Sequence, residues 1–157
     1  MLHLIKDRFV WQDPGALIDG DLELVLMVRS EPDLLRGWAP AYHFDMRHAE
    51  TGQLLGGISF RVGRSDHLRL YAGHLGYGVS PQYRGHHYAA RSCRLLLPLA
   101  RAHGFTHLWI TCNPDNYASR RTCELAGAIY VDTVDVPKTD SVYGPGEEVK
   151  CRYRLDL

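Results

Sequence analysis

The chain has 157 residues, of which 45% are hydrophobic and 23% are charged. A chain of this length and composition is expected to form one soluble domain, residues 1–157, that buries roughly 70% of the surface exposed by its unfolded form. Eighteen basic residues balance eighteen acidic ones, so no overall field favours DNA, RNA or an anionic membrane, and neither nucleic acid nor a membrane is an expected partner.

The first forty residues have the weakest pattern. The apolar run 22–28 predicts a strand, and 31–38 predicts at most one or two helical turns. The segments 42–47 and 54–62 predict two strands of a hairpin. Gly52 supplies the positive φ that the connecting turn needs.

Strands and helices alternate in the C-terminal two thirds of the chain. Apolar residues recur at helical spacing over 85–103, with arginines on the other face and a bend expected at Pro98. The order of elements places helices against a mixed sheet, an α/β class of fold. The predicted elements are strand 74–79, helix 85–103, strand 107–112, helix 116–126, and strands 128–136 and 149–155.

Cysteine and histidine spacing predicts neither disulfides nor a metal site. The four cysteines form no C-x-x-C pair and the N-terminus shows no signal-peptide pattern, which predicts a reduced, cytoplasmic protein. His103 and His107 lie four residues apart, but Gly104 interrupts the helix between them and no third ligand keeps register, so no metal is expected.

The segment from Val79 to Ala89 ends a strand, turns and begins a helix. Backbone N–H groups in the first turn of a helix have no internal partner and lie at the positive end of the helix dipole, so this geometry binds phosphate. Gly85 would let a ligand approach the backbone, and Arg84 can add a charge-assisted bond. An ordinary strand-to-helix turn with a surface arginine fits these residues equally well.

Two motifs together resemble the GNAT superfamily of acyl-CoA N-acyltransferases. The signature of that superfamily, Q/R-x-x-G-x-G/A, is similar to the run from Gln82 to His87, within Pro81-x-Tyr83-Arg84-Gly85-x-x-Tyr88-Ala89. The end of its fifth strand and its fourth helix are similar to Cys112-Asn113-Pro114-Asp115-Asn116-x-x-Ser119-x-x-x-x-Glu124-x-x-Gly127. The resemblance covers residues 42–157, and Arg152-Tyr153-Arg154 is similar to the last strand of a subgroup of acetyltransferases.

The resemblance implies a GNAT fold, which is a mostly antiparallel mixed sheet with its fourth and fifth strands splayed apart, flanked by helices. It also implies acetyl-CoA as co-substrate, with the pyrophosphate on the turn and the pantetheine arm paired to the backbone at Val79. Asn116 and Ser119 would hold the arm. The implied cofactor-binding residues are Val79, Gln82, Arg84, Gly85, His86, His87, Tyr88, Ala89, Asn116 and Ser119.

The chain departs from the family pattern at two positions. His87 stands where the signature has glycine or alanine; a helical φ permits histidine, so crowding of the pyrophosphate is expected rather than backbone strain. Cys123 aligns with a family tyrosine that protonates the departing thiolate. Since a free thiol has a pKa of about 8.5, the leaving group needs only modest acid help, which water can supply.

An alkyl amine has a pKa of roughly 10, so direct transfer at pH 7 requires a base. His74 is the candidate, because it lies where related sequences place a glutamate; its alternative is a histidine satisfied by local hydrogen bonds. Glu124 could bind the acceptor amine, although local pairing on its helix is favoured. Strand alternation puts Tyr77 opposite His74 and predicts a core position for it.

Acceptor contacts are the least defined part of the site. The acidic residues Asp19, Asp21 and Glu23 could attract a cationic amine, but a solvated charged face is the favoured interpretation. Aromatic residues in or near segments that build the acceptor pocket of the superfamily are Trp11, Trp38, Tyr42 and Tyr71, although a core position is the favoured interpretation for each.

Three hypotheses follow. The first is an N-acetyltransferase that passes the acetyl group directly to a primary amine of a small molecule or peptide. The second is a non-catalytic module that binds CoA or acyl-CoA through the same turn. The third is a partner-binding α/β domain without a cofactor. Homodimer formation is compatible with each of them.

Overall fold

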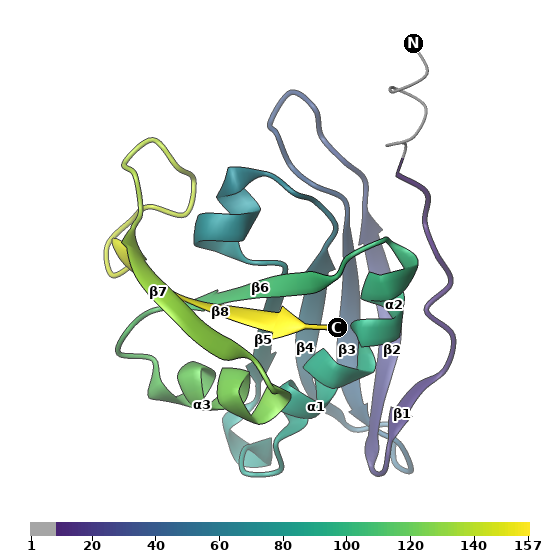
Figure 1. Cartoon of the computed structure of the whole chain (residues 1–157). Helices are drawn as coiled ribbons and strands as arrows, with labels where there is room; N and C mark the ends of the chain where they lie inside the picture. The colour runs from purple at the N-terminus through teal and green to yellow at the C-terminus, as the bar shows by residue number, and fades with distance from the viewer. Residues whose placement is uncertain (1–8) are drawn as a thin grey trace.

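Two antiparallel sheets and three helices make up the computed structural model, which describes residues 9–157 (Figure 1). The first sheet has the strand order β1-β2-β3-β4-β5 and the second has the order β6-β8-β7. The strands of the first sheet are β1 (Leu17–Asp19), β2 (Leu22–Ser30), β3 (Ala41–His48), β4 (Leu54–Arg61) and β5 (Leu75–Val79). The helices are α1 (Tyr88–Leu95), α2 (Leu97–Ala102) and α3 (Tyr117–Ala126), and the second sheet consists of β6 (His107–Cys112), β7 (Ile129–Asp135) and β8 (Val149–Asp156).

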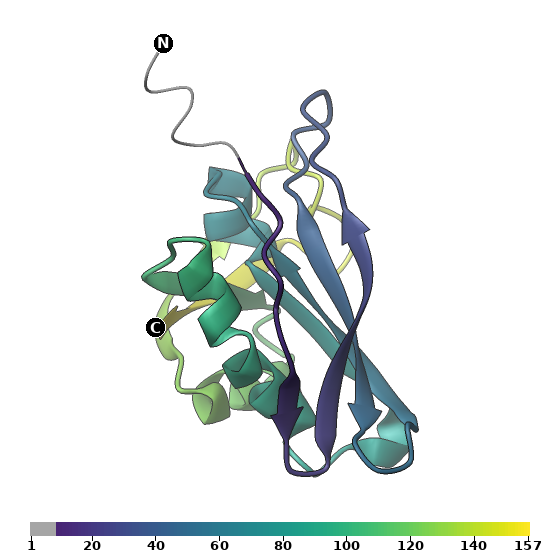
Figure 2. The same cartoon turned by 90° about the vertical axis from the view of Figure 1, so that its right-hand side faces the viewer.

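The core lies between the five-stranded sheet and the helices, which cover one face of it (Figure 2). Side chains alternate across β3, where Tyr42, Phe44 and Met46 are buried, with none more than 3% exposed, because they point toward the helices. On the helices, Cys93 of α1 and Cys123 of α3 reach the same core. Burial of one face is thus the reason why β3 alternates in sequence.

The predicted helix 85–103 is two helices. The chain interrupts the helical ladder at Leu96, two residues before Pro98, which has no N–H to donate and lies in the first turn of α2. The expected bend at Pro98 is therefore a break. The first helix also begins later than predicted, at Tyr88, because residues 81–83 form a short 3-10 turn, η2 (Pro81–Tyr83), ahead of it.

The strands β5 and β6 meet at one point and then diverge. At the junction the His74 N–H donates to the carbonyl oxygen of Trp109 at 2.7 Å, and the described residues show no further strand pairing between β5 and β6. Gly73 beside it has φ of 74°, and a Cβ there would lie 3.1 Å from the backbone nitrogen of Thr111. Glycine therefore permits the close approach from which the two sheets splay.

Three features of the N-terminal half differ from the sequence predictions. The segment 31–38 has no helical turn; Asp33 and Trp38 form an antiparallel bridge with N–H···O distances of 3.0 and 2.9 Å. The Asp33 carboxylate accepts from the backbone of the intervening turn, which competes with helix formation. The short edge strand β1 and the π-helical turn η1 (His67–Ala72) were not predicted.

The remaining strand and helix predictions are confirmed to within two residues at each end, and the predicted mixed α/β class is correct. Within residues 9–157, no helix combines the length and apolar character that crossing a bilayer requires.

Candidate active site

A cavity of about 400 Å³ opens where β5, the turn after it, the start of α1 and one face of α3 meet. Most of the cofactor-binding residues predicted from sequence line it, and Gln82 and His86 do not; both are exposed. The lining residues are Tyr77, Gly78, Val79, Tyr83, Arg84, Gly85, His87, Tyr88, Ala89, Asn116, Ala118, Ser119, Arg121, Thr122 and Leu125.

The backbone of β5 offers free hydrogen-bonding groups to this cavity. His74 and Ser80, at the two ends of the strand, direct backbone groups to β4, through the bonds from Arg61 N to His74 O and from Ser80 N to Leu55 O. Because backbone groups alternate in direction along an antiparallel strand, those of Tyr77 and Val79 face the opposite edge. There the Val79 carbonyl already accepts from Arg84 Nε at 3.1 Å, which leaves the Val79 N–H and the backbone groups of Tyr77 for a ligand.

The first turn of α1 presents unpaired N–H groups. In the described part of the chain, the amides of Tyr88, Ala89 and Ala90 have no hydrogen-bond acceptor, and the N-cap residue His87 provides no side-chain cap. Such amides, at the positive end of a helix dipole, are suited to bind phosphate oxygens.

His87 adopts a left-handed backbone conformation, with φ of 60° and ψ of 28°. The prediction of a helical φ at this position was therefore wrong. A left-handed conformation costs an L-residue roughly 1–2 kcal/mol, whereas glycine adopts it freely. The structure thus supplies a physical reason for glycine at the sixth position of the signature, and His87 carries backbone strain at the edge of the cavity.

Acidic residues of the β1–β2 hairpin hold α1 in place. The Tyr88 hydroxyl donates to Asp21 Oδ2 at 2.8 Å. The Arg91 guanidinium donates to Asp19 Oδ2 and to Asp21 Oδ1, each at 2.8 Å, and to the carbonyl oxygen of His86 at 3.3 Å. The hydrogen bonds from Arg91 and then from Tyr88 hold the pKa of Asp21 below its ordinary value. Asp19 and Asp21 thus form specific ion pairs, which the interpretation as a solvated face did not anticipate.

The α3 wall of the cavity begins at Asn116, which is the N-cap of the helix. Its Oδ1 accepts from the Ser119 amide at 3.1 Å, a hydrogen bond that fixes the start of the helix. The Ser119 hydroxyl is 3.0 Å from the Tyr77 hydroxyl on the opposite wall. The two residues expected to hold the pantetheine arm therefore lie in the cavity together with Tyr77.

Tyr77 packs against the core, as predicted, and also lines the cavity, which the prediction did not include. Its hydroxyl lies 3.6 Å from the Sγ atom of Cys123, the residue that stands where the family pattern has a tyrosine. The phenol of Tyr77 on β5 therefore lies close to that position. Burial, as the largest cause, raises the pKa of Tyr77 well above its ordinary value, and the phenol stays protonated at neutral pH.

Cys123 is fully buried behind Tyr77. Its hydrogen bond with Cys112 and then its burial raise the pKa of the Cys123 thiol, so this sulfur remains protonated. A neutral buried thiol is a poor nucleophile. All four cysteines of the chain are free and buried.

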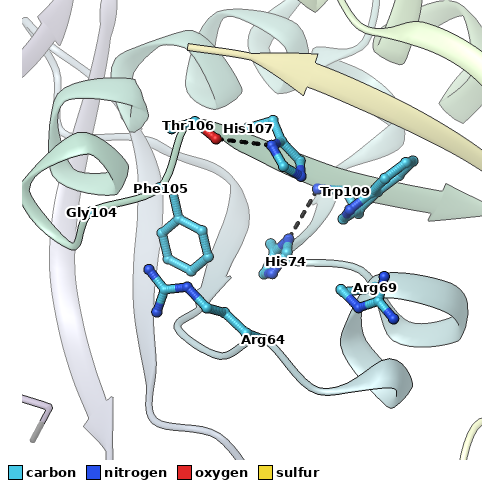
Figure 3. A pocket seen from close by; sticks show the side chains of 8 residues that line it. All are labelled: Arg64, Arg69, His74, Gly104, Phe105, Thr106, His107 and Trp109. Carbon is cyan, nitrogen blue, oxygen red and sulfur yellow. Dashed lines mark hydrogen bonds between the residues drawn. The ribbon is translucent and has the colours of Figure 1, made fainter. Parts of the chain in front are cut away.

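His74 is 2% exposed and lies at the β5–β6 junction, outside the cavity. Its Nδ1 accepts from the Trp109 amide at 2.9 Å (Figure 3), and its Nε2 donates to the Gly63 carbonyl at 2.8 Å. Burial is the largest cause that lowers the pKa of His74 to about 4. These contacts match the alternative of a locally satisfied histidine.

Glu124 is exposed on α3 and does not line the cavity. Its Oε2 lies 3.1 Å from Arg121 Nη1 one turn away, as local pairing predicts.

Several lining residues escaped the sequence interpretation although a signal was present. On α3, Ala118, Thr122 and Leu125 recur at steps of four and three residues and therefore share one helix face with Ser119. Residues 9–157 contain no group of three or more His, Cys, Asp or Glu side chains placed to hold a metal ion.

The fold is shared with solved acetyltransferases. A Vibrio cholerae protein, assigned as a ribosomal-protein-serine acetyltransferase, has a TM-score of 0.67 and 15% identity over 93% of this chain and 100% of that chain. The Microcin C7 self immunity acetyltransferase MccE, in complex with acetyl-CoA and AMP, has a TM-score of 0.57 and 14% identity over 74% of this chain. RimL, a ribosomal L7/L12 alpha-N-protein acetyltransferase in complex with CoA, has a TM-score of 0.57 and 18% identity over 78% of this chain.

These identities are low enough that the similarity shows the fold alone. This chain spans 61% of the MccE chain and 64% of the RimL chain. A family model described as Acetyltransferase (GNAT) domain matches residues 19–129, which is more than half of the sequence. The chain therefore belongs to the GNAT acetyltransferase family. No curated protein sequence matches it.

Proposed function

We propose that this chain transfers the acetyl group of acetyl-CoA directly to a primary amine of a small molecule or peptide. The observation that carries the proposal is the cavity between β5 and α3, which is bordered by the unpaired amides of α1. Free N–H groups for a diphosphate and a free strand edge for an amide-bearing arm stand side by side there.

Each end of the cavity suits one part of acetyl-CoA. The amides of Tyr88 and Ala89 and the guanidinium of Arg84 would bind the diphosphate. The pantetheine amides would pair with the backbone at Val79, and Asn116 Nδ2 is available because Oδ1 serves the helix cap. This arrangement would aim the thioester toward Tyr77, where positioning of the two reactants lowers the barrier.

Tyr77 is the group we assign to the leaving thiolate. Its protonated phenol can donate a hydrogen bond to the sulfur as negative charge develops, the role that sequence alignment left without a side chain at Cys123. Ser119, which is 3.0 Å from the phenol, orients it.

The contacts of His74 favour a structural role for it rather than that of the base. A peptide α-amino group has a pKa of about 7.7–8.0 and is partly neutral near pH 8, so it needs less basic help than an alkyl amine. This difference favours a peptide N-terminus among the candidate acceptors. The solved relatives described as acting on ribosomal proteins, one of them on an N-terminal serine, point to the same class of acceptor.

A non-catalytic CoA-binding module is the second candidate. The strained His87 at the cavity edge and a cysteine in place of the family tyrosine are the observations that favour it. It predicts the same binding without turnover.

Calorimetry with CoA and a free-thiol assay with acetyl-CoA separate these functions. The acceptor panel contains a serine-initiated peptide, its N-terminally blocked form with one internal lysine, and a small alkyl amine, each at pH 7 and pH 8. Acetyl transfer predicts thiol release with an amine acceptor, and the α-amine preference predicts that the unblocked peptide reacts fastest. Binding without thiol release would support the module.

A matched pair of variants locates the binding site. Ala118 is exposed and lines the cavity, so Ala118→Trp should fill it and weaken CoA binding at least about tenfold, equivalent to the loss of about 1.4 kcal/mol. Tyr117 is 74% exposed and does not line the cavity, so Tyr117→Trp should bind CoA normally. Equal affinity in the two variants, or no binding by the unmodified chain, would contradict the proposed site.

A further inference from the structure

A second cavity, of about 210 Å³, lies beside the β5–β6 junction (Figure 3). The loop before β6, the first half of β6, and the segment that carries η1 surround it, and it shares no lining residue with the CoA cavity. Its lining residues are Arg64, Arg69, His74, Gly104, Phe105, Thr106, His107 and Trp109.

The charge on the walls of this cavity is positive. Arg64 and Arg69 lie on two sides of the hollow in Figure 3, and none of the lining residues is acidic. In the described ranges Arg64 has no carboxylate within ion-pair distance; its Nη2 donates to the His103 carbonyl at 3.2 Å. Arg69 pairs with Asp66, whose side chain is 76% exposed, so water weakens that pair.

The remaining polar groups of the walls also include free donors. His107 Nδ1 is 3.0 Å from the Thr106 hydroxyl; when that hydroxyl donates to Nδ1, Nε2 carries the proton and can donate to a ligand. The Arg152 guanidinium carbon lies 4.1 Å from the centre of the Trp109 ring and covers one face of it. The ring of His74, which is buried, also lines the cavity and adds no negative charge to its walls.

Flat apolar surface stands next to these donors. Phe105 is 8% exposed, and the Arg64 guanidinium carbon lies 4.4 Å from its ring centre, an arrangement that holds the guanidinium at the cavity wall. The Trp109 ring forms part of the opposite wall in Figure 3. The ligand that fits is therefore small, negatively charged at one end and flat and apolar at the other.

We propose that this cavity binds a small organic carboxylate. The carboxylate oxygens accept hydrogen bonds from the guanidinium groups of Arg64 and Arg69, and the apolar part lies against the Trp109 ring and the small exposed part of Phe105. Arginine suits this role because its planar donors match the geometry of a carboxylate. The proposal is independent of acetyl transfer, since the two cavities have separate walls.

The test is a titration of the full chain with benzoate. Calorimetry measures the affinity, and NMR measures the shifts of the His107 and Trp109 ring signals. Benzylamine has the same ring with the opposite charge, benzamide has it without charge, and inorganic phosphate has charge without a ring. Saturable binding of benzoate that shifts both ring signals is expected, with benzylamine and benzamide at least about tenfold weaker, as loss of charge-assisted hydrogen bonds predicts.

Two variants and one control locate the binding. Arg64→Gln and Arg69→Gln should each weaken benzoate at least about fivefold, whereas Arg101→Gln, at an exposed position of α2 outside the cavity, should not change it. Circular dichroism confirms that each variant is folded. No saturable binding, equal binding of benzylamine, or unchanged affinity in both variants would overturn the proposal.

Two further outcomes also decide it. Tighter binding of phosphate than of benzoate would identify an inorganic-anion site and overturn the assignment of an organic carboxylate. A repeat with saturating CoA should leave benzoate affinity unchanged; displacement by CoA would show that this cavity holds a phosphate of the nucleotide and is no separate site. Failure of CoA to bind at all would contradict the proposed function and leave the benzoate result standing.

Discussion

Replacing His87 with glycine should make the protein more stable, although it removes a side chain. The backbone there has φ of 60°, which costs an L-residue roughly 1–2 kcal/mol and glycine almost nothing. Glycine also loses more conformational freedom on folding, which costs roughly 0.5–1 kcal/mol and offsets part of that gain. The net gain lies within about 0–1.5 kcal/mol, and the midpoints of the two ranges give about 0.75 kcal/mol, or about 1.5–3 °C in Tm for a chain of this size.

The matched control is His87→Ala, which removes the same ring and keeps the strained backbone. Urea unfolding of both variants without ligand, followed by circular dichroism, separates the effect of the backbone from that of the imidazole. The expected order of stability is glycine above alanine, with alanine close to the unmodified chain because the His87 side chain makes no cap hydrogen bond. An alanine variant as stable as the glycine variant would refute the strain argument.

Three other predictions concern groups around the candidate site. Because the pKa of His74 is lowered to about 4, the unfolded chain takes up this proton first as the pH falls from about 6.5, so folding stability should decline by up to about 3 kcal/mol as the pH approaches 4. NMR titration of the ring checks this, and a midpoint near 6.5 would contradict it. Asp21→Asn should weaken CoA binding about two- to fivefold in calorimetry by loosening α1, while Glu23→Gln on the same hairpin should not; equal effects would remove the positioning role. Tyr77→Phe should lower kcat at least about tenfold and leave acetyl-CoA affinity nearly unchanged, and normal turnover in steady-state kinetics would exclude the phenol from hydrogen-bonding the departing thiolate.

Prediction from sequence succeeded where the cause is local. Strand β6 was predicted with its exact bounds, since a short run of β-branched and aromatic residues lies between a glycine-bearing loop and Asn113-Pro114. The start of α3 at Asn116 was also within reach, because an N-cap side chain bonds to an amide only three residues away. Such signals need no knowledge of the rest of the chain.

The conformation of His87 shows where local reasoning ends. Nothing in the run of residues from Arg84 to Tyr88 distinguishes a helical from a left-handed backbone there. The ion pairs of Asp19 and Asp21 with Arg91 hold α1 in a fixed position. The backbone of the turn before α1, which includes His87, must then connect β5 to a helix held in that place. Partners about seventy residues apart in sequence decide that position, so the sequence pattern contains no trace of it.

The sequence by itself determined most of the order of elements, the strand-to-helix turn after β5 and the family, because helix caps, apolar spacing and the two motifs depend on neighbouring residues. Only the tertiary structure decided what each polar side chain does. It placed the Tyr77 phenol beside Cys123, closed His74 into the junction of two sheets and gathered Arg64 and Arg69 around one cavity. The physical reason is that hydrogen-bond partners and burial, which set the chemistry of a titratable group, come from strands and helices distant along the chain.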